Sequence, residues 1–218
     1  MSLGNIKIEK FLNESIIAIV NAGRDKEISA ALKRFAYDRE RLKQGKKLHG
    51  RLDRLSKKKK RKVADQLKAG EVHRKIVKQA RDRYSTYRNV SWVALRKYPA
   101  LLKTLAMEGK SKRTLSGWME EARQFYANAR ANTEVMEKLA GFGVTDADLE
   151  EGLRLVGEVE KSAAHHEMLK GEAVRATEER NLAFLEFKAW MRDFKRICRI
   201  ALADTPQKLE KLGIKIRS

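Results

Sequence analysis

The sequence predicts an all-α protein: an elongated helical bundle of long antiparallel helices, formed by tandem duplication with pseudo-two-fold symmetry. Three observations predict this fold. Apolar residues recur three or four positions apart over most of the chain, only two prolines interrupt 218 residues, and the second half of the chain repeats the first at a constant offset. A hydrophobic content of 42% in a chain of this length is enough to bury a substantial core.

The internal repeat is supported by identical residues in separated segments, aligned without a gap. These pairs are Leu42 with Leu149, Gly45 with Gly152, Leu48 with Leu155, Gly50 with Gly157, Pro99 with Pro206, and Leu105 with Leu212. Their common spacing is called the repeat offset below. A single register that joins such distant segments is difficult to obtain by chance. We therefore expect two helical repeats, residues 1–107 and 108–218, packed as one bundle.

Each repeat is expected to begin with a helix, over residues 5–34 in the first copy and 112–140 in the second. Both segments carry apolar residues at helical spacing, among them Ile8, Phe11 and Leu12 in the first and Leu115, Trp118 and Met119 in the second. Gly141 and Gly143 are typical of a helix terminus, because glycine readily leaves the helical conformation. They predict the end of this helix in the second copy.

A cap residue is expected to start a second helix in each copy. Thr145 or Asp146 is suited to this role in the second copy, and Asp38 occupies the equivalent place of Thr145 in the first. The side chains of such residues accept hydrogen bonds from the unpaired amides of a helix N-terminus.

This second helix is expected to be unusually long. Apolar spacing continues for roughly 55 residues in the second copy, or about 80 Å at 1.5 Å per residue, and Gly157 and Gly171 are places where the helix can bend. Pro99 and Pro206 are each expected to open a short final helix, where a missing amide donor costs little.

The formal charge of +20 is distributed very unevenly between the copies. Residues 1–107 contain 29 Lys and Arg against 10 Asp and Glu, a net +19, and residues 108–218 contain 20 against 19, a net +1. A concentrated positive field attracts polyanions and releases their counterions on binding. The asymmetry therefore indicates contact of the first repeat with nucleic acid or another anionic surface.

The strongest local concentration of charge is a run of six cations, called the basic run below: Lys57, Lys58, Lys59, Lys60, Arg61 and Lys62. Six consecutive positions go more than once around a helix, so we expect no face of this segment to pack against the bundle. The run is interpreted either as a polyanion-binding surface or as a solvated stretch of helix. The second copy carries no such cluster, so the scaffold itself does not require it.

A second candidate for polyanion binding consists of Arg74, Lys75, Lys78 and Arg81. Tyr84, Tyr87 and Trp92 follow them, and aromatic rings between cations can stack on unpaired bases. Tyr84 and Tyr87 also fit a helical stripe with Ile76, Ala80 and Ser91, and core packing is the interpretation we favour for the aromatic residues. No known sequence-reading motif accompanies these residues, so sequence-specific recognition is not expected.

No combination of residues indicates catalysis, and we expect neither enzymatic activity nor a cofactor. His165 and His166 are adjacent and point about 100° apart on a helix, so a shared metal ion is not expected. The single cysteine, Cys198, excludes an intramolecular disulfide and lies in a predicted apolar stripe, where it is expected to be buried and inert.

The C-terminal quarter carries a Trp-Met-x-Asp-Phe core followed by Arg-Ile-Ala-Leu and Pro-Gln-x-Leu-Glu-x-Leu-Gly. These motifs begin at Trp190, Arg199 and Pro206. This segment resembles the closing segment of a group of bacterial helical proteins of unknown function. The resemblance implies an all-helical fold and no particular activity, and it does not extend to the lysine-rich first repeat.

Two functional hypotheses follow from the sequence. The first is a helical scaffold or interaction protein without catalytic activity, whose long helices bind a protein partner or a second copy of the chain. The alternative is sequence-nonspecific binding of nucleic acid or another polyanion through the first repeat. Contact with a membrane surface ranks third, because the basic run lacks the aromatic residues of an interfacial helix. The apolar stretch at residues 16–20 is too short to span a membrane, and a reducing cytoplasm is the expected location.

Overall fold

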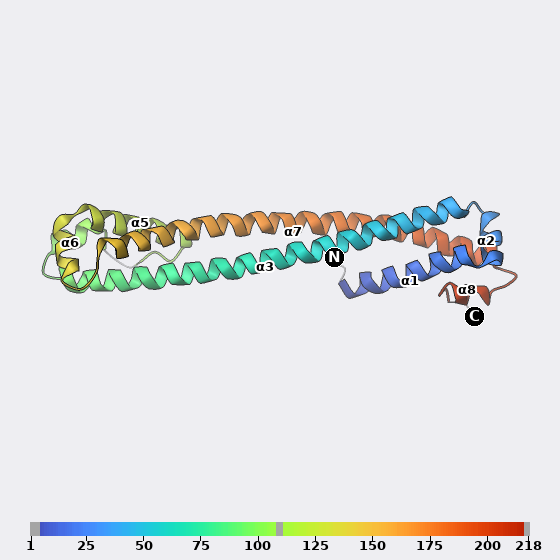
Figure 1. The fold of residues 1–218 in the computed structure, drawn as a ribbon, viewed down its shortest axis with the longest axis horizontal. Helices are drawn as coiled ribbons and strands as arrows, with labels where there is room; N and C mark the ends of the chain where they lie inside the picture. The colour runs from blue at the N-terminus through green and yellow to red at the C-terminus, as the bar shows by residue number, and fades with distance from the viewer. Residues whose placement is uncertain (1–4, 108–110, 216–218) are drawn as a thin grey trace. The chain divides into compact units, whose positions relative to one another are not determined.

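The computed structural model describes residues 5–107 and 111–215, with the side chains of residues 5–7 left out. In this part of the chain every regular element is a helix, so the all-α prediction is confirmed. The helices are α1 (Asn5–Arg24), α2 (Lys26–Lys33), α3 (Arg39–Leu95), α4 (Pro99–Thr104), α5 (Leu115–Ala131), α6 (Thr133–Ala140), α7 (Asp146–Ala201) and α8 (Lys208–Lys211) (Figure 1).

The internal repeat recurs in the positions of the helices. The first residues of α2 and α6 are separated by the repeat offset, and so are those of the long helices α3 and α7, which contain 57 and 56 residues. The expected length of roughly 55 residues is therefore confirmed. Helix α7 continues through Gly157 and Gly171 without interruption.

The first helix of each copy is divided in two, which the apolar spacing alone did not predict. The Asp25 side chain accepts hydrogen bonds from the amides of Glu27 and Ile28, both at 3.1 Å, and thereby starts α2. Asn132, the equivalent residue of the second copy, accepts from the amide of Val135 at 3.1 Å and starts α6. Such side chains compete with the helical backbone for its amides, so the chain turns at both positions although the apolar spacing continues.

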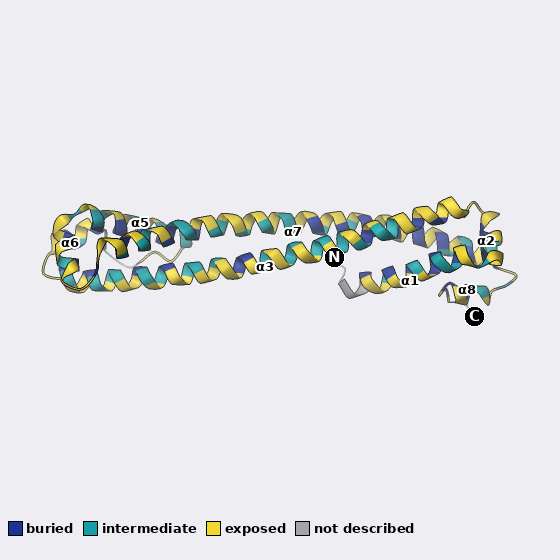
Figure 2. Ribbon diagram, in the orientation of Figure 1, coloured by how far each residue is buried: buried dark blue, intermediate teal, exposed yellow. Residues whose placement is uncertain are grey.

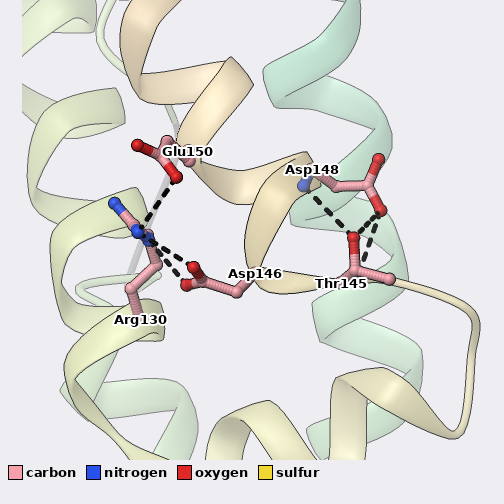
Figure 3. Close-up of polar contacts among 5 residues, drawn as sticks. All are labelled: Arg130, Thr145, Asp146, Asp148 and Glu150. Atoms are coloured by element: carbon pink, nitrogen blue, oxygen red, sulfur yellow. Dashed lines mark hydrogen bonds and ion pairs between the residues drawn. The ribbon is translucent and has the colours of Figure 1, made fainter.

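The long helices start at the expected cap residues. Asp38 accepts a hydrogen bond from the Arg41 amide at 2.9 Å. At the equivalent place Thr145 Oγ1 accepts from the Asp148 amide at 3.3 Å, while the Asp148 carboxylate accepts from the Thr145 amide at 3.0 Å (Figure 3). This reciprocal pair is a capping box. The hydrogen bond from the Thr145 hydroxyl is the main reason why the pKa of Asp148 is lowered.

A group of ion pairs holds the start of α7 against α5. Arg130 Nε donates to Asp146 at 2.7 Å, and its Nη2 lies 3.4 Å from Glu150 (Figure 3). The hydrogen bond from Arg130 lowers the pKa of the Asp146 carboxyl. The acidic side chains also lie at the positive end of the helix dipole.

The two prolines behave differently. Pro99 is the first residue of α4, as predicted. Helix α8 begins two residues after Pro206, so the expectation that this proline opens the helix is wrong. The Pro206 carbonyl oxygen accepts a hydrogen bond from the Leu209 amide at 2.9 Å.

The compact units of the structure do not coincide with the sequence repeats. Unit 1 consists of Met1–Ala64 and Gly171–Ser218, and unit 2 consists of Asp65–Lys170. Each unit therefore combines part of the first copy with part of the second. Helices α3 and α7 each contribute one part to unit 1 and the other part to unit 2.

The core of unit 1 is formed by α1, α2, α8 and the adjoining parts of the two long helices (Figure 2). The Trp190 ring stacks on Phe187 and Phe194, at centroid distances of 6.4 and 5.2 Å. Arg51 lies 2.7 Å from Glu186, and Lys58 lies 2.7 Å from Glu179 further along. The two long helices therefore run antiparallel in this unit, as predicted.

The core of unit 2 is formed by α4, α5, α6 and the other parts of the long helices. Tyr84 is buried and makes edge-to-face contacts with the rings of Trp118, Phe125 and Tyr126. His73 of α3 contacts Ser162 of α7, and Tyr87 of α3 contacts Asp148 of α7. These contacts show that the long helices run antiparallel in this unit too.

Two equivalent glycines allow large aromatic side chains to lie directly on a helix. A Cβ atom added at Gly45 would overlap the Trp190 ring, and one added at Gly152 would overlap the Tyr126 ring. Gly50, further along α3, has no atom within 4 Å of its own added Cβ. Packing therefore explains the first glycine pair that the two copies share, but not the pair of Gly50 and Gly157.

We predict that Gly45→Ala and Gly152→Ala each destabilise the protein by about 1–3 kcal/mol, because a buried aromatic ring must move to accommodate the methyl group. Gly50→Ala is the matched control. It should stabilise the helix by about 0.5–1 kcal/mol, since alanine has the higher helix propensity and meets no neighbour. Urea unfolding followed by circular dichroism measures all three. Equal effects at Gly45 and Gly50 would contradict the packing argument.

Positive φ angles occur at equivalent positions of the two copies. Ala36 has φ 60° where Gly143 has φ 76°, and Ala106 has φ 54° where Gly213 has φ 65°. The first copy therefore holds alanine in a conformation that the second copy gives to glycine. This left-handed conformation costs a residue with a Cβ atom about 1–2 kcal/mol.

We predict that Ala36→Gly stabilises the protein by about 0.5–1 kcal/mol, since relief of the left-handed strain exceeds the entropic cost of glycine. Gly143→Ala should destabilise it by a similar amount. The measurement is the free energy of unfolding in urea. A loss of stability in Ala36→Gly would show that the backbone there is not strained.

Candidate polyanion interface and cationic groove

The net charge of the units differs from that of the repeats. Unit 1 contains 30 Lys and Arg against 14 Asp and Glu, a net +16, and unit 2 contains 19 against 15, a net +4. Unit 1, which includes the basic run, therefore carries most of the positive charge. The sequence division by repeat did not show this, because the cation-rich end of the second copy belongs to the same unit.

Four of the six side chains of the basic run are engaged in ion pairs. Lys58 and Lys62 each lie 2.7 Å from a carboxylate of α7, Glu179 and Glu172 respectively. Within α3 the side chain of Lys57 contacts Asp53 at 2.8 Å, and Lys60 contacts Glu9 of α1.

The expectation that no face of the run packs is therefore wrong. Lys58, Lys59 and Lys62 are half-buried, and the partners of Lys58 and Lys62 are acidic rather than apolar. The long stems of lysine can lie along a neighbouring helix while the ammonium group remains in contact with carboxylate and water. The carboxylates of α7 and α1 are distant in sequence, so the run alone could not reveal them.

A set of cations that only partly overlaps the basic run forms an exposed surface on the solvent side of α3. This set, called the cationic face, has intervals of four, seven, three and four residues, which keep its members on one side of the helix. Its members are Lys43, Lys47, Arg54, Lys57 and Arg61, all of them exposed. They extend over about 27 Å, at 1.5 Å of helix axis per residue.

Most of the cationic face has no acidic partner. Among the described residues, Lys47, Arg54 and Arg61 make no ion pair, whereas Lys43 lies 3.7 Å from Glu40 and Lys57 pairs with Asp53. Exposed pairs of this kind contribute little free energy, so a stronger anion can displace them.

The equivalent surface of the second copy is nearly neutral. At the repeat offset, the five cations correspond to Glu150, Arg154, Lys161, Ala164 and Met168. Arg154 is itself paired with Glu151 at 2.6 Å and with Glu158. The helical scaffold therefore does not need the cationic face for folding.

The second group of candidate residues lies in unit 2, at an open groove of about 560 Å³. Of the four cations predicted from sequence, Arg74, Lys78 and Arg81 line this groove and Lys75 does not. Its complete lining is His73, Arg74, Val77, Lys78, Arg81, Asp82, Arg113 and Leu115. Arg113 was not among the predicted residues, because it precedes α5 and approaches α3 only in the folded chain.

The aromatic residues beside this group have different environments. Tyr84 is buried, and its hydroxyl donates to Glu121 at 2.7 Å. Burial is the main reason why its pKa is raised. Tyr87 is half-buried and donates to Asp148 at 3.1 Å. Trp92 is 56% exposed, so the core interpretation is wrong for this residue.

The histidines do not converge on a metal position with other ligands. Within the residues that the structure describes, no three side chains of the types His, Cys, Asp or Glu gather at one point. The rings of His73 and His166 stack at a centroid distance of 6.4 Å, and His73 Nδ1 lies 2.9 Å from the Ser162 hydroxyl. His165 instead borders a different surface pocket, beside Asp65.

Comparison of the chain with models of protein families, with curated proteins and with solved structures finds no match in any of the three. Over the described residues, no helix has a stretch that is both long and apolar enough to cross a membrane.

Cys198 is buried among the apolar residues of unit 1, and burial raises the pKa of its thiol to about 12. Because the thiolate is the reactive form, we predict that Ellman's reagent at pH 8 labels Cys198 in the native protein at least about 100-fold more slowly than in urea. Rapid labelling without denaturant would show that the thiol is accessible. The Cys198→Ser variant, which has the residue found at the equivalent Ser91, is the reagent blank.

Proposed function

We propose that this chain is a helical binding protein whose cationic face on α3 binds nucleic acid without reading its sequence. The observation that carries the proposal is the spacing of five exposed cations on one side of a single helix, opposite charges being few. Repulsion between like charges one or two turns apart opposes this arrangement in the unbound protein. A bound polyanion relieves that repulsion.

The dimensions of the cationic face suit a nucleic-acid backbone. Its length of about 27 Å corresponds to about eight base pairs, at 3.4 Å of helix axis per phosphate on one strand. Lysine and arginine bind phosphate through charge and hydrogen bonds, and such contacts fix position without reading bases. A face that offers only cations therefore supports affinity without sequence preference.

The basic run contributes to this function less than its composition suggests. Lys58 and Lys62 are held by carboxylates of α7, and Lys60 is held by Glu9. Binding a phosphate with these lysines first requires breaking a pair with a carboxylate of another helix. Lys57 and Arg61 are the members of the run that belong to the cationic face.

We predict that a fluorescein-labelled DNA duplex binds with an affinity that falls steeply with salt. Neutralisation of about five phosphates gives a slope of log K against log [salt] of about −4 to −5. The triple variant Lys47→Gln, Arg54→Gln, Arg61→Gln should lower this slope by about 3 in magnitude. Fluorescence anisotropy between about 50 and 200 mM salt measures both slopes, and a random duplex of equal length tests sequence preference.

The matched control is the triple variant Lys58→Gln, Lys60→Gln, Lys62→Gln, which removes the same charge from ion-paired positions. It should retain most of the binding and change the slope by less than about 1. Equal losses in both variants would mean that binding follows net charge and not this face. Absence of binding at low salt would refute the proposal and favour a protein partner for the scaffold.

A further inference from the structure

The groove of unit 2 that Arg74, Lys78, Arg81 and Arg113 line has the size and composition of a small-ligand site. Its volume of about 560 Å³ lies within the range of about 300–1,000 Å³ that is typical of such sites. Val77 and Leu115 supply apolar surface. Four cations and a single carboxylate, Asp82, supply the charge, a net +3 with His73 neutral.

The positive charge of the groove is not neutralised by the protein itself. Among the described residues, Arg74, Lys78 and Arg113 make no ion pair with a carboxylate. Arg81 lies over the ring of the buried Trp118, with its guanidinium carbon 4.9 Å from the ring centroid. Stacking restricts the orientation of the guanidinium and leaves its in-plane N–H groups available to an anion.

The second copy has a larger side chain at the position equivalent to Val77. Val77 corresponds to Phe184 at the repeat offset. In unit 1 the Phe184 ring fills the equivalent position and packs edge-to-face against Phe11, with centroids 5.3 Å apart. Val77 has a smaller side chain than Phe184 and lines the groove of unit 2.

Two of the four cations of the groove are specific to unit 2, whereas Arg81 and His73 correspond to Lys188 and Arg180 in the second copy. The residues that correspond to Arg74 and Lys78 are Asn181 and Leu185. The same scaffold therefore folds with phenylalanine in place of Val77 and without two of the cations of the groove. Since neither valine at this position nor these two charges are required by the fold, their occurrence together points to a ligand.

The combination of apolar and cationic lining selects the chemical class of that ligand. A phosphate monoester carries a charge of about −1.5 to −2 at neutral pH and offers three acceptor oxygens, which match arginine donors. An apolar or aromatic group attached to the phosphate can pack on Val77 and Leu115. Inorganic phosphate lacks this second contact, and an uncharged aromatic compound lacks the first.

We infer that the groove lined by Arg74, Val77, Lys78, Arg81 and Arg113 is a binding site for a phosphate monoester that carries an apolar or aromatic group. This site is separate from the cationic face, which lies in unit 1, and does not depend on it. Both a soluble nucleotide and a lipid phosphate have the required chemistry.

The test is isothermal titration calorimetry of the full chain with 1-naphthyl phosphate. We expect a dissociation constant below about 1 mM, and binding at least about tenfold weaker for inorganic phosphate and for 1-naphthol alone. Val77→Phe introduces the residue of the other copy without changing the charge. It should weaken binding of 1-naphthyl phosphate at least about tenfold by filling the groove.

Two further variants distinguish binding in the groove from loss of folding and from binding to the cationic face. The double variant Arg74→Asn, Lys78→Leu also uses residues of the other copy and should weaken binding at least about tenfold, even if Val77→Phe proves unstable on thermal melting. The triple glutamine variant of Lys47, Arg54 and Arg61 should bind 1-naphthyl phosphate normally, while Val77→Phe should bind DNA normally. Absence of ligand binding in the groove and absence of nucleic-acid binding on the cationic face are thereby distinguished.

Unchanged affinity in both groove variants, or equal affinity for inorganic and 1-naphthyl phosphate, would overturn the inference. Adenosine monophosphate and phosphatidylcholine vesicles containing phosphatidic acid then identify the source of the phosphate. Groove-dependent binding of the nucleotide indicates a soluble ligand, and groove-dependent binding of the vesicles indicates a lipid phosphate. No binding of 1-naphthyl phosphate, of the nucleotide or of the vesicles refutes the site.

Discussion

The rest of the structure depends on one constraint: each hydrophobic core needs residues from both sequence copies. The core of unit 1 combines residues 8–52 with residues 183–214, and that of unit 2 combines residues 80–107 with residues 118–159. Helices α3 and α7 serve both cores, so their length follows from the packing requirement and not from helix propensity alone. A single repeat would leave the apolar faces of its own long helix partly uncovered.

Beyond the core of unit 1, ion pairs lie beside small buried residues of α7, Ala173 and Ala176, along the long helices. The pairs of Lys58 with Glu179 and Lys62 with Glu172 lie past Leu52, the last buried leucine that α3 contributes to this core. Ion pairs of this kind add little stability, but they define which sides of α3 are already occupied. The cations that remain on the outer side are the ones that can bind an external anion.

The sequence predicts the helical class, the repeat offset, the length of α7 and the capping residues of the long helices, because these depend on local patterns. Asp25 and Asn132 were missed as helix starts since the apolar spacing continues past them. The division into units could not be predicted, because it depends on contacts between residues of different copies. For the same reason the basic run looked uniform, although Glu172 and Glu179 engage only some of its lysines, and Arg113 was not recognised beside Lys78.

The sharing of each core between the copies also suggests how the two surfaces came to differ. An unfused ancestor with one copy would cover its apolar faces only by pairing with an identical subunit, and every surface residue would then appear twice. Joining two such genes keeps the dimer-like cores and removes this symmetry from the exterior. The copies differ at Lys43 and Arg61, which correspond to Glu150 and Met168, and at Val77, which corresponds to Phe184. The fused chain is in this sense a heterodimer encoded as one polypeptide, in which each half stabilises the other while its surface evolves independently.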